Sequence, residues 1–142
     1  MTPSRILPDL QCSLIAEDIR REANGKFMLI GLLEVLPVQQ FPLTAFIPLK
    51  FFNRWVAGVG TFTESIRLVA PDNSVVFKSD MKFGMKDSHS PAINGTVMGQ
   101  VTFSVPGLYY VEVLVDDVMK LRYPLPIAQV QQQPPPGQPP AS

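Results

Sequence analysis

Few residues in this chain could carry acid–base or nucleophilic chemistry. There is one histidine, His89, and one cysteine, Cys12. A Ser-His-Asp or Cys-His device needs the histidine as its base. His89 lies between Ser88 and Ser90, whose side chains point away from it in an extended segment, while Cys12 shares a strand face with apolar residues and is typical of a small buried hydrophobe. A zinc site needs three or four Cys or His ligands. The chain therefore predicts neither a triad nor a bound metal, and we expect no cofactor.

Glu64 is the carboxylate with the most unusual place in the sequence pattern. It shares a strand face with Phe62, Ile66 and Leu68. We expect the strand to carry Glu64 to the rim of its sheet, because an unpaired glutamate is almost never fully buried. The alternative is a buried carboxylate, which would be worth inspecting as a functional site. Glycoside hydrolysis needs two opposed acids in a pocket, and no such pair stands out. We expect a protein that is not an enzyme.

The charge pattern argues against nucleic acid as a partner. Twelve basic and twelve acidic residues balance, and no basic run exceeds two residues, Arg20-Arg21. Binding to phosphates needs a concentrated positive field. No apolar stretch approaches the roughly 20 residues of a membrane span, and residues 1–8 lack the apolar core of a signal peptide. We therefore expect a cytoplasmic protein without nucleic-acid or membrane partners.

The elements that must position these residues are strands. From Thr96 to Ile127, three alternating apolar and polar runs are separated by Pro106-Gly107 and Asp116-Asp117, which predicts an antiparallel meander. Similar runs fill the rest of the chain, which is typical of a sandwich or a barrel. We expect an all-β, immunoglobulin-like antiparallel β-sandwich of about 7-9 strands, in which Tyr109 or Tyr110 ties the corner before a late strand. The alternation predicts a buried face made of Val97, Val101, Phe103, Val105, Tyr109, Val111, Val113, Val115, Met119, Leu121, Tyr123 and Leu125.

The early part of the chain predicts a hairpin. Asn24-Gly25 is its turn signal, since both residues tolerate positive φ. The run from Phe27 to Val35 is apolar on both faces, which is typical of a central strand covered on both sides. Gly31 within this run indicates a bulge or a close neighbour. Before the turn, the charged stretch from Glu17 to Glu22 is either a short helical turn or the end of a strand.

Composition divides the chain into three segments. Residues 1–9 form a lead-in, residues 10–130 form the β-sandwich domain, and residues 131–142 form a tail. The tail, QQQPPPGQPPAS, has no charge and no apolar side chain larger than Ala or Pro. Because such a segment cannot bury a core, we expect it to be disordered or to adopt polyproline II.

Two segments carry a resemblance to a known family. Residues 17–31, EDIRREANGKFMLIG, are close to the pattern (D/E)-D-I-R-x-E-x-N-G-K-x-x-L-I-G. Residues 103–113, FSVPGLYYVEV, match F-x-V-P-G-x-Y-x-V-x-V. Both patterns resemble a family of small bacterial proteins of unknown function. The resemblance implies a bacterial cytosolic β-sandwich and implies no activity.

Phe51, Phe52 and Trp55 are the first candidate partner-binding residues. They cluster on one predicted strand with Pro48, which cannot donate to a β-ladder and therefore indicates either a sheet edge or a bulge. Aromatic side chains on an edge strand suit strand addition or the pairing of sheet faces. The other interpretation is that these aromatic residues belong to the core.

A long polar loop is the second part of the candidate surface. It is predicted from Gly84 to Gly95 and brings in Met85 and His89 as candidate partner-binding residues. We therefore predict a non-enzymatic protein–protein interaction or assembly module, whose partner is another protein or a second copy of the chain. The alternative is a carbohydrate- or small-ligand-binding β-sandwich that uses Trp55 and nearby polar loops.

Overall fold

The structure is a computed structural model that describes residues 5–130 of the 142. Strands dominate these residues, as the alternating pattern predicts, and no helix occurs among them. The strands are β1 (Asp9–Arg21), β2 (Phe27–Leu32), β3 (Leu36–Val38), β4 (Leu43–Val56), β5 (Gly60–Val69), β6 (Val75–Met85), β7 (Ala92–Phe103), β8 (Gly107–Val115) and β9 (Val118–Gln129). The predicted tail, residues 131–142, lies outside the described residues.

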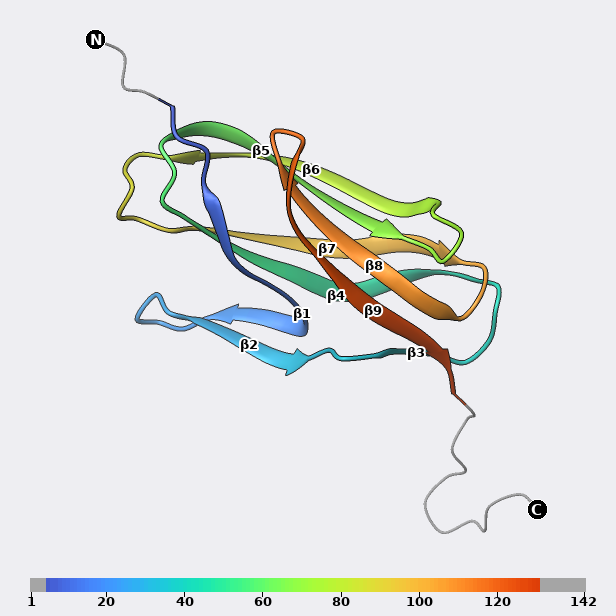
Figure 1. Cartoon of the computed structure of the whole chain (residues 1–142). Coiled ribbons are helices and arrows are strands. Elements are labelled where there is room, and N and C mark those ends of the chain that lie inside the picture. The colour runs from blue at the N-terminus through green and yellow to red at the C-terminus, as the bar shows by residue number, and fades with distance from the viewer. Residues whose placement is uncertain (1–4, 131–142) are drawn as a thin grey trace, which may run out of the picture.

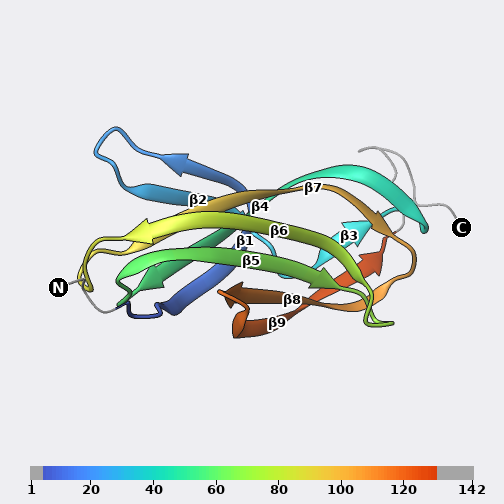
Figure 2. The same ribbon diagram turned by 90° about the horizontal axis from the view of Figure 1, so that it is seen from above.

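The strands form two sheets that pack face to face. One sheet has the order β2-β1-β4-β7 and the other has the order β3-β9-β8-β5-β6. Figures 1 and 2 show the two layers with the early hairpin at one side. All pairings are antiparallel except that of β3 with β9, which is parallel. The predicted all-β sandwich is confirmed.

The strand order is that of an immunoglobulin-like fold. Neighbours β1, β4 and β7 correspond to strands A, B and E, while β9, β8, β5 and β6 correspond to G, F, C and C′ of a variable-type domain. The predicted corner is also present, because the Tyr109 hydroxyl donates to the carbonyl oxygen of Val105 at 2.7 Å. Strand β2 has no counterpart in that scheme and is an addition to the fold.

The core lies between the sheets and confirms most of the predicted buried face. Alternate residues of β8 point inward, and Tyr109, Val111 and Val113 are completely buried. Opposite them, the inward face of β4 contributes Phe51, whose ring stacks on Phe77 of β6 with centroids 5.7 Å apart. One apolar cluster therefore joins both sheets.

Four of the residues predicted to be buried are exposed instead. Met119 and Leu121 are 44% and 37% exposed, because β3 covers only the last residues of β9 and leaves its first half at a sheet edge. Val97 is 44% exposed because it opposes Lys50 on the outer face of the sheet, beyond a register shift in β4. Val105 is 49% exposed in the turn before β8.

Three local predictions can be decided from the strand boundaries. Residues 17–21 continue β1, so the charged stretch is a strand rather than a helical turn. Pro48 lies at a register shift between β4 and β7, so the bulge interpretation holds and β4 is a central strand rather than an edge. The loop predicted from Gly84 to Gly95 is shorter than expected and spans only residues 86–91, because β6 and β7 extend into it.

The corner tyrosine gives a test of the fold. We expect Tyr109→Phe to lower the free energy of unfolding by about 1–2 kcal/mol, because a buried hydroxyl loses its acceptor and the Val105 carbonyl loses its donor. Tyr110→Phe is the matched control, since the Tyr110 ring lies on the outer face against Arg122 and keeps that contact without its hydroxyl. Urea unfolding of both variants measures the difference, and equal effects would contradict the corner assignment.

Candidate interaction surface

The residues predicted as a partner surface are mostly buried in the core. Phe51 and Trp55 are 0% exposed, Met85 is 5% exposed and Phe52 is 6% exposed. Of the predicted set, only His89 is exposed, in the short loop after β6. Phe51 and Trp55 belong to the core between the sheets, as the second interpretation holds, whereas Phe52 is buried on the other face of β4. Strand β4 pairs with β1 on one side and with β7 on the other, so this apolar strand is central and does not form an edge.

The loop that bears His89 is organised by one aspartate. The carboxylate of Asp87 accepts the backbone N–H groups of His89 and Ser90, both at 2.9 Å. These hydrogen bonds hold the pKa of Asp87 below its ordinary value, the bond from His89 being the largest cause. The imidazole of His89 is exposed at the loop tip, and the structure does not bring it together with Cys12 on β1.

Glu64 lies in the core, so the expectation of a rim position is wrong. Its side chain is 1% exposed. Its Oε2 accepts the indole N–H of Trp55 at 2.6 Å and an amide N–H of Asn94 at 2.9 Å. The three residues come from β4, β5 and β7, so one carboxylate links the two sheets. These two hydrogen bonds, which satisfy Oε2, explain how a glutamate is accommodated there.

Further polar groups surround this link. Asn53 is 0% exposed and opposes Asn94 across the β4–β7 pair. Neither amide atom of Asn53 has a hydrogen-bond partner within the described residues, nor has Oε1 of Glu64 or Oγ1 of Thr96. The cluster is enclosed between the sheets, so it acts as an internal connection and does not offer a binding surface. In the sequence, the one indication of this buried cluster is that Glu64 shares a strand face with apolar residues.

The alternative of a carbohydrate site loses its key residue. A sugar-binding tryptophan must expose the face of its ring, whereas Trp55 is fully buried and stacks on Phe83 with centroids 5.6 Å apart. A polar hollow of about 370 Å³ is lined by Thr63, Ser65, Lys78, Asp80, Asp116 and Asp117. An apolar one of about 390 Å³ is lined by Ala70, Pro71, Asp72, Ser74, Val76, Ser104, Val105 and Tyr109. Neither contains Trp55.

Strand β1 changes its partner halfway along. Its first half pairs with β4 and its second half pairs with β2, and Ala16 opposes both Lys50 and Leu32. Figure 1 shows β1 bending at this point, so that its second half and β2 form a separate hairpin below the four-stranded sheet. The bend is fixed by Asp18, which accepts from the Lys50 ammonium at 2.6 Å. Hydrogen bonds from Lys50 and then Arg20 lower the pKa of Asp18 to about 2.

The hairpin packs on the outer face of β4 and β7. The rings of Phe27 and Phe52 meet edge to face with centroids 6.0 Å apart. A Cβ atom added at Gly95 would lie 3.4 Å from Cδ1 of Ile19, an ordinary van der Waals distance, so Ile19 of the hairpin lies directly over β7. These contacts explain the burial of Phe52, which points away from the core between the sheets. Sequence patterns do not reveal such a contact because it joins residues far apart in the chain.

The turn of the hairpin is short and well defined. Gly25 N–H donates to the Glu22 carbonyl at 2.9 Å, and Glu22 N–H donates to the Lys26 carbonyl at 2.8 Å. Gly25 has φ = 87°, as in a three-residue hairpin loop that ends in a glycine bulge. The hairpin predicted at Asn24-Gly25 is therefore confirmed.

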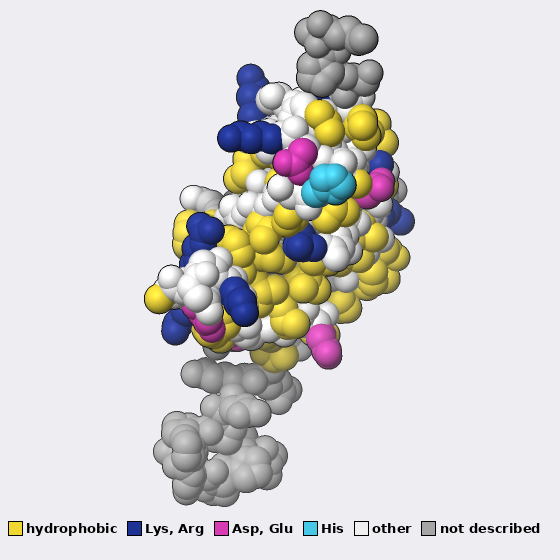
Figure 3. Space-filling view, turned by 90° about the vertical axis from the view of Figure 1, so that its left-hand side faces the viewer, with side chains coloured by type: hydrophobic (Ala, Val, Ile, Leu, Met, Phe, Trp, Pro, Cys, Tyr) yellow, Lys and Arg dark blue, Asp and Glu magenta, His cyan; other side chains and the backbone are white. Residues whose placement is uncertain are grey.

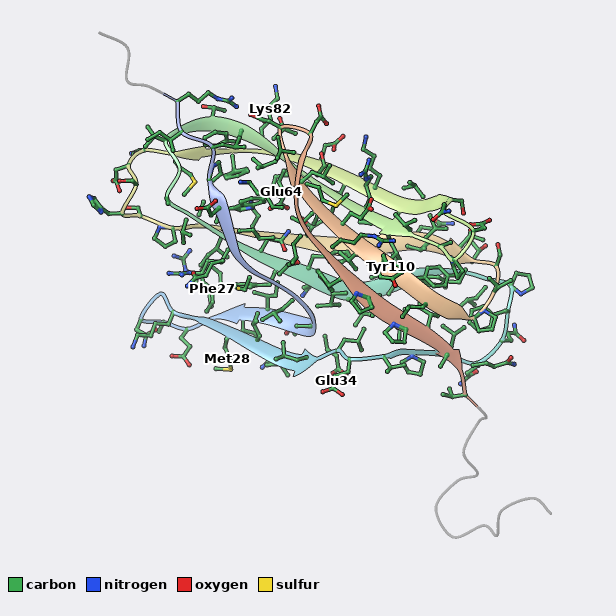
Figure 4. The ribbon with its side chains drawn as sticks, viewed as in Figure 1. Phe27, Met28, Glu34, Glu64, Lys82 and Tyr110 are labelled. Carbon is green, nitrogen blue, oxygen red and sulfur yellow. The ribbon has the colours of Figure 1, made fainter. Side chains whose placement is uncertain are left out.

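Strand β2 is an edge strand, which corrects the prediction of a central one. It has only β1 as a neighbour. Phe27, Met28 and Leu32 are 40%, 41% and 57% exposed. Both faces of β2 are apolar, but only one of them is covered by other described residues of the chain. One face packs on the sheet through Phe27, and the other, with Met28 and Leu32, faces outward. Figure 4 shows Met28 on the side of the hairpin that points away from the body.

The edge strands β2, β6 and β7 differ in protection. Strand β7 contains no charge, but Val97 is its only large apolar side chain that is exposed. Natural edge strands usually carry charges that discourage pairing with another chain. Edge strand β6 follows this rule, since Lys78, Asp80 and Lys82 line it. Strand β2 has the sequence FMLIGL and contains no charge. We call the segment from Lys26 to Glu34, with β2 at its centre, the hairpin edge.

The outer faces of the two sheets also differ. Exposed apolar side chains on the four-stranded sheet include Leu14, Phe46 and Val97. Figure 3 shows apolar surface gathered between the side chain of His89 and a group of basic side chains. On the five-stranded sheet, the Glu112 carboxylate instead pairs with Arg67 at 3.0 Å and Arg122 at 3.5 Å. Exposed apolar side chains therefore occur on both sheets, with Val118, Met119 and Leu121 at the start of β9, and those of the four-stranded sheet include the hairpin edge.

Comparison with known proteins identifies the family. The model of a family of unknown function (DUF6941) matches residues 11–128. The chain belongs to this family. No curated protein matches it. An immunoglobulin-like protein from Pseudomonas aeruginosa is 12% identical, with 89% of this chain and 100% of that chain covered and a TM-score of 0.41. Membership of DUF6941 confirms the resemblance to a family of unknown function, while the signature at residues 17–31 stays a prediction.

Replacing Glu64 tests the internal link. We expect Glu64→Leu to lower the free energy of unfolding by about 2–6 kcal/mol, because two buried N–H donors each lose their acceptor. Glu64→Gln keeps a carbonyl acceptor of the same shape and should cost less than half as much. Trp55 is the only tryptophan, so its fluorescence during urea unfolding reports directly on the site. Equal losses in the two variants would contradict the hydrogen-bonded link.

Asp18 makes the hairpin sensitive to acid. Its pKa is about 2 in the folded chain against an ordinary 3.8, so its contribution to stability is present above about pH 4 and is lost as the pH falls towards 2. We expect the protection of the hairpin amides against hydrogen exchange, relative to the intrinsic exchange rate at each pH, to fall over this window. Asp18→Asn should show fast exchange already at pH 5 and no further step. If Asp18→Asn showed the same dependence of hydrogen exchange on pH as the original chain, the role of the Asp18–Lys50 pair would be contradicted.

Proposed function

We propose that this domain is a non-enzymatic protein-interaction module that binds its partner at the hairpin edge. The observation that carries the proposal is the uncharged, apolar edge strand β2, with Leu32 57% exposed. An exposed edge offers unpaired backbone N–H and C=O groups to another strand. Strand addition satisfies these groups, while alternate side chains give specificity.

The energetics favour a covered edge. Burying an exposed Phe, Met or Leu side chain completely contributes about 1.5–3 kcal/mol. In the single chain, Phe27, Met28 and Leu32 each keep 40% or more of their surface exposed. A substantial part of their burial free energy is therefore still available to a partner. A partner strand that covers them obtains this free energy in addition to backbone hydrogen bonds.

The hairpin is also held in a fixed position. The Asp18–Lys50 ion pair fixes its base, and the Phe27–Phe52 contact fixes one face. A preorganised strand loses less conformational entropy on binding than a mobile one. This rigidity supports a role in recognition, whereas the enclosed position of Glu64 and the isolated position of His89 supply no support for catalysis.

We also propose that the protein is cytoplasmic, on the basis of its cysteine content. The single cysteine, Cys12, is a free thiol, and structural disulfides are rare in reducing compartments. This supports, without testing, the expectation of a bacterial cytoplasmic protein.

Site-specific photo-cross-linking tests the proposed function. We expect a photoreactive amino acid at position 28 to give discrete protein adducts in a lysate of the native host, because Met28 points outward from the hairpin edge. The same group at position 82 is the matched control, since Lys82 is exposed on the charged edge strand β6. Adducts at both positions in equal yield, or none at position 28, would contradict the proposal.

A further inference from the structure

We propose that the partner at the hairpin edge is a second copy of this chain, paired antiparallel about a two-fold axis at Ile30. This inference rests on the proposed function and names its partner. When two identical strands pair antiparallel, a step forward along one strand is matched by a step backward along the other. With Ile30 opposite the partner's Ile30, Met28 lies opposite the partner's Leu32 and Lys26 lies opposite the partner's Glu34.

The hairpin edge is self-complementary in this register. Met28, Ile30 and Leu32 alternate within β2 and so share one face, with Lys26 just before the strand and Glu34 just after it. The pairing puts apolar side chains opposite apolar ones at the centre and opposite charges at both ends. By symmetry each charge pair occurs twice. A shift of two residues towards either end would place a charge opposite an apolar residue, so this register is the favoured one.

The end charges have no competing partners in the monomer. Lys26 and Glu34 are both exposed. Neither makes an ion pair within the described part of the chain. The whole chain has a formal net charge of +0, so two copies approach without long-range repulsion.

The backbone is a strand from Phe27 to Leu32, so Lys26 and Glu34 flank it on either side. Pairing with β1 keeps one register on both sides of Gly31, with Asp18 opposite Ile30 and Ala16 opposite Leu32. The N–H of Leu33 still donates to the carbonyl of Ile15 at 2.8 Å. Gly31 has φ = 69°, and an added Cβ would lie 2.6 Å from Cδ of Glu17. The side chain of Glu17 therefore occupies the place beside Gly31 and leaves the free edge open.

Nothing described covers that edge. In Figure 1, β2 is the outermost strand of the hairpin, and β1 lies on its inner side. Two copies joined there would merge their four-stranded sheets into one continuous sheet through the hairpins. Because a single strand pair makes a small contact, we expect a dimer that dissociates on dilution.

Charge exchange tests both the dimer and its register. We expect sedimentation velocity to detect a concentration-dependent dimer of the full chain. Lys26→Glu and Glu34→Lys should each weaken dimerisation by about tenfold, because each creates two like-charge contacts. The double variant, Lys26→Glu with Glu34→Lys, should restore the affinity to near that of the unmodified chain. Unchanged Trp55 fluorescence in every variant would show that folding is retained.

Disulfide trapping gives a second, independent test. Opposing residues of an antiparallel pair have Cα atoms about 4.5–5.5 Å apart, which is within the range that a disulfide spans. In a Cys12→Ser background, Ile30→Cys should therefore form a cross-linked dimer under mild oxidation. Leu32→Cys is the matched control, because its own copy lies about 13 Å away along the strand at about 3.3 Å per residue.

The outcomes separate this inference from the proposed function. Single charge variants that leave the dimer unchanged, or equal trapping at positions 30 and 32, would overturn the register. A chain that stays monomeric at all concentrations, while position 28 still gives adducts with a different protein, would overturn self-pairing and leave the proposed function standing. Absence of any adduct at position 28 would overturn both.

Discussion

The buried carboxylate of Glu64 is the interaction on which the rest of the structure depends. It accepts hydrogen bonds from Trp55 and Asn94 and so connects β4 and β7 of one sheet to β5 of the other. A buried charge without such donors would cost several kcal/mol, so the two sheets must meet in the one arrangement that supplies them. That arrangement turns Trp55 into the core and fixes which face of β4 points inward.

The orientation of β4 decides where exposed apolar surface remains. With Phe51 and Trp55 inside, Phe52 points to the outer face and needs separate cover. The bent hairpin supplies that cover through Phe27. The consequence is that one side of the hairpin is used inside the molecule, while its opposite side and its free edge remain exposed. Edge strand β6 carries Lys78, Asp80 and Lys82, whereas the four-stranded sheet has two edge strands without charge, β7 and β2 of the hairpin edge. Of these two, the hairpin edge exposes more large apolar side chains.

Strand addition at this edge explains features that stability alone does not. An isolated sandwich gains nothing from an uncharged edge strand, because such a strand invites uncontrolled association. In the proposed dimer, the charges at its two ends, Lys26 and Glu34, would direct association into a single register and limit growth to a closed pair. Under this proposal, the apolar residues of the edge form a specific contact between two copies.

The sequence by itself determined the local features of this protein. Alternation fixed the strands and the buried face of β8, and Asn24-Gly25 fixed the hairpin turn, because these depend on neighbours in the chain. Tertiary structure alone decided that Glu64 is buried, that Phe51 and Trp55 are core residues, and that β2 is an edge. The physical reason is that apolar periodicity records burial without recording which strand, hairpin or second copy provides the cover. A run apolar on both faces is therefore the same in sequence whether it lies at the centre of a sheet or at an edge that a partner completes.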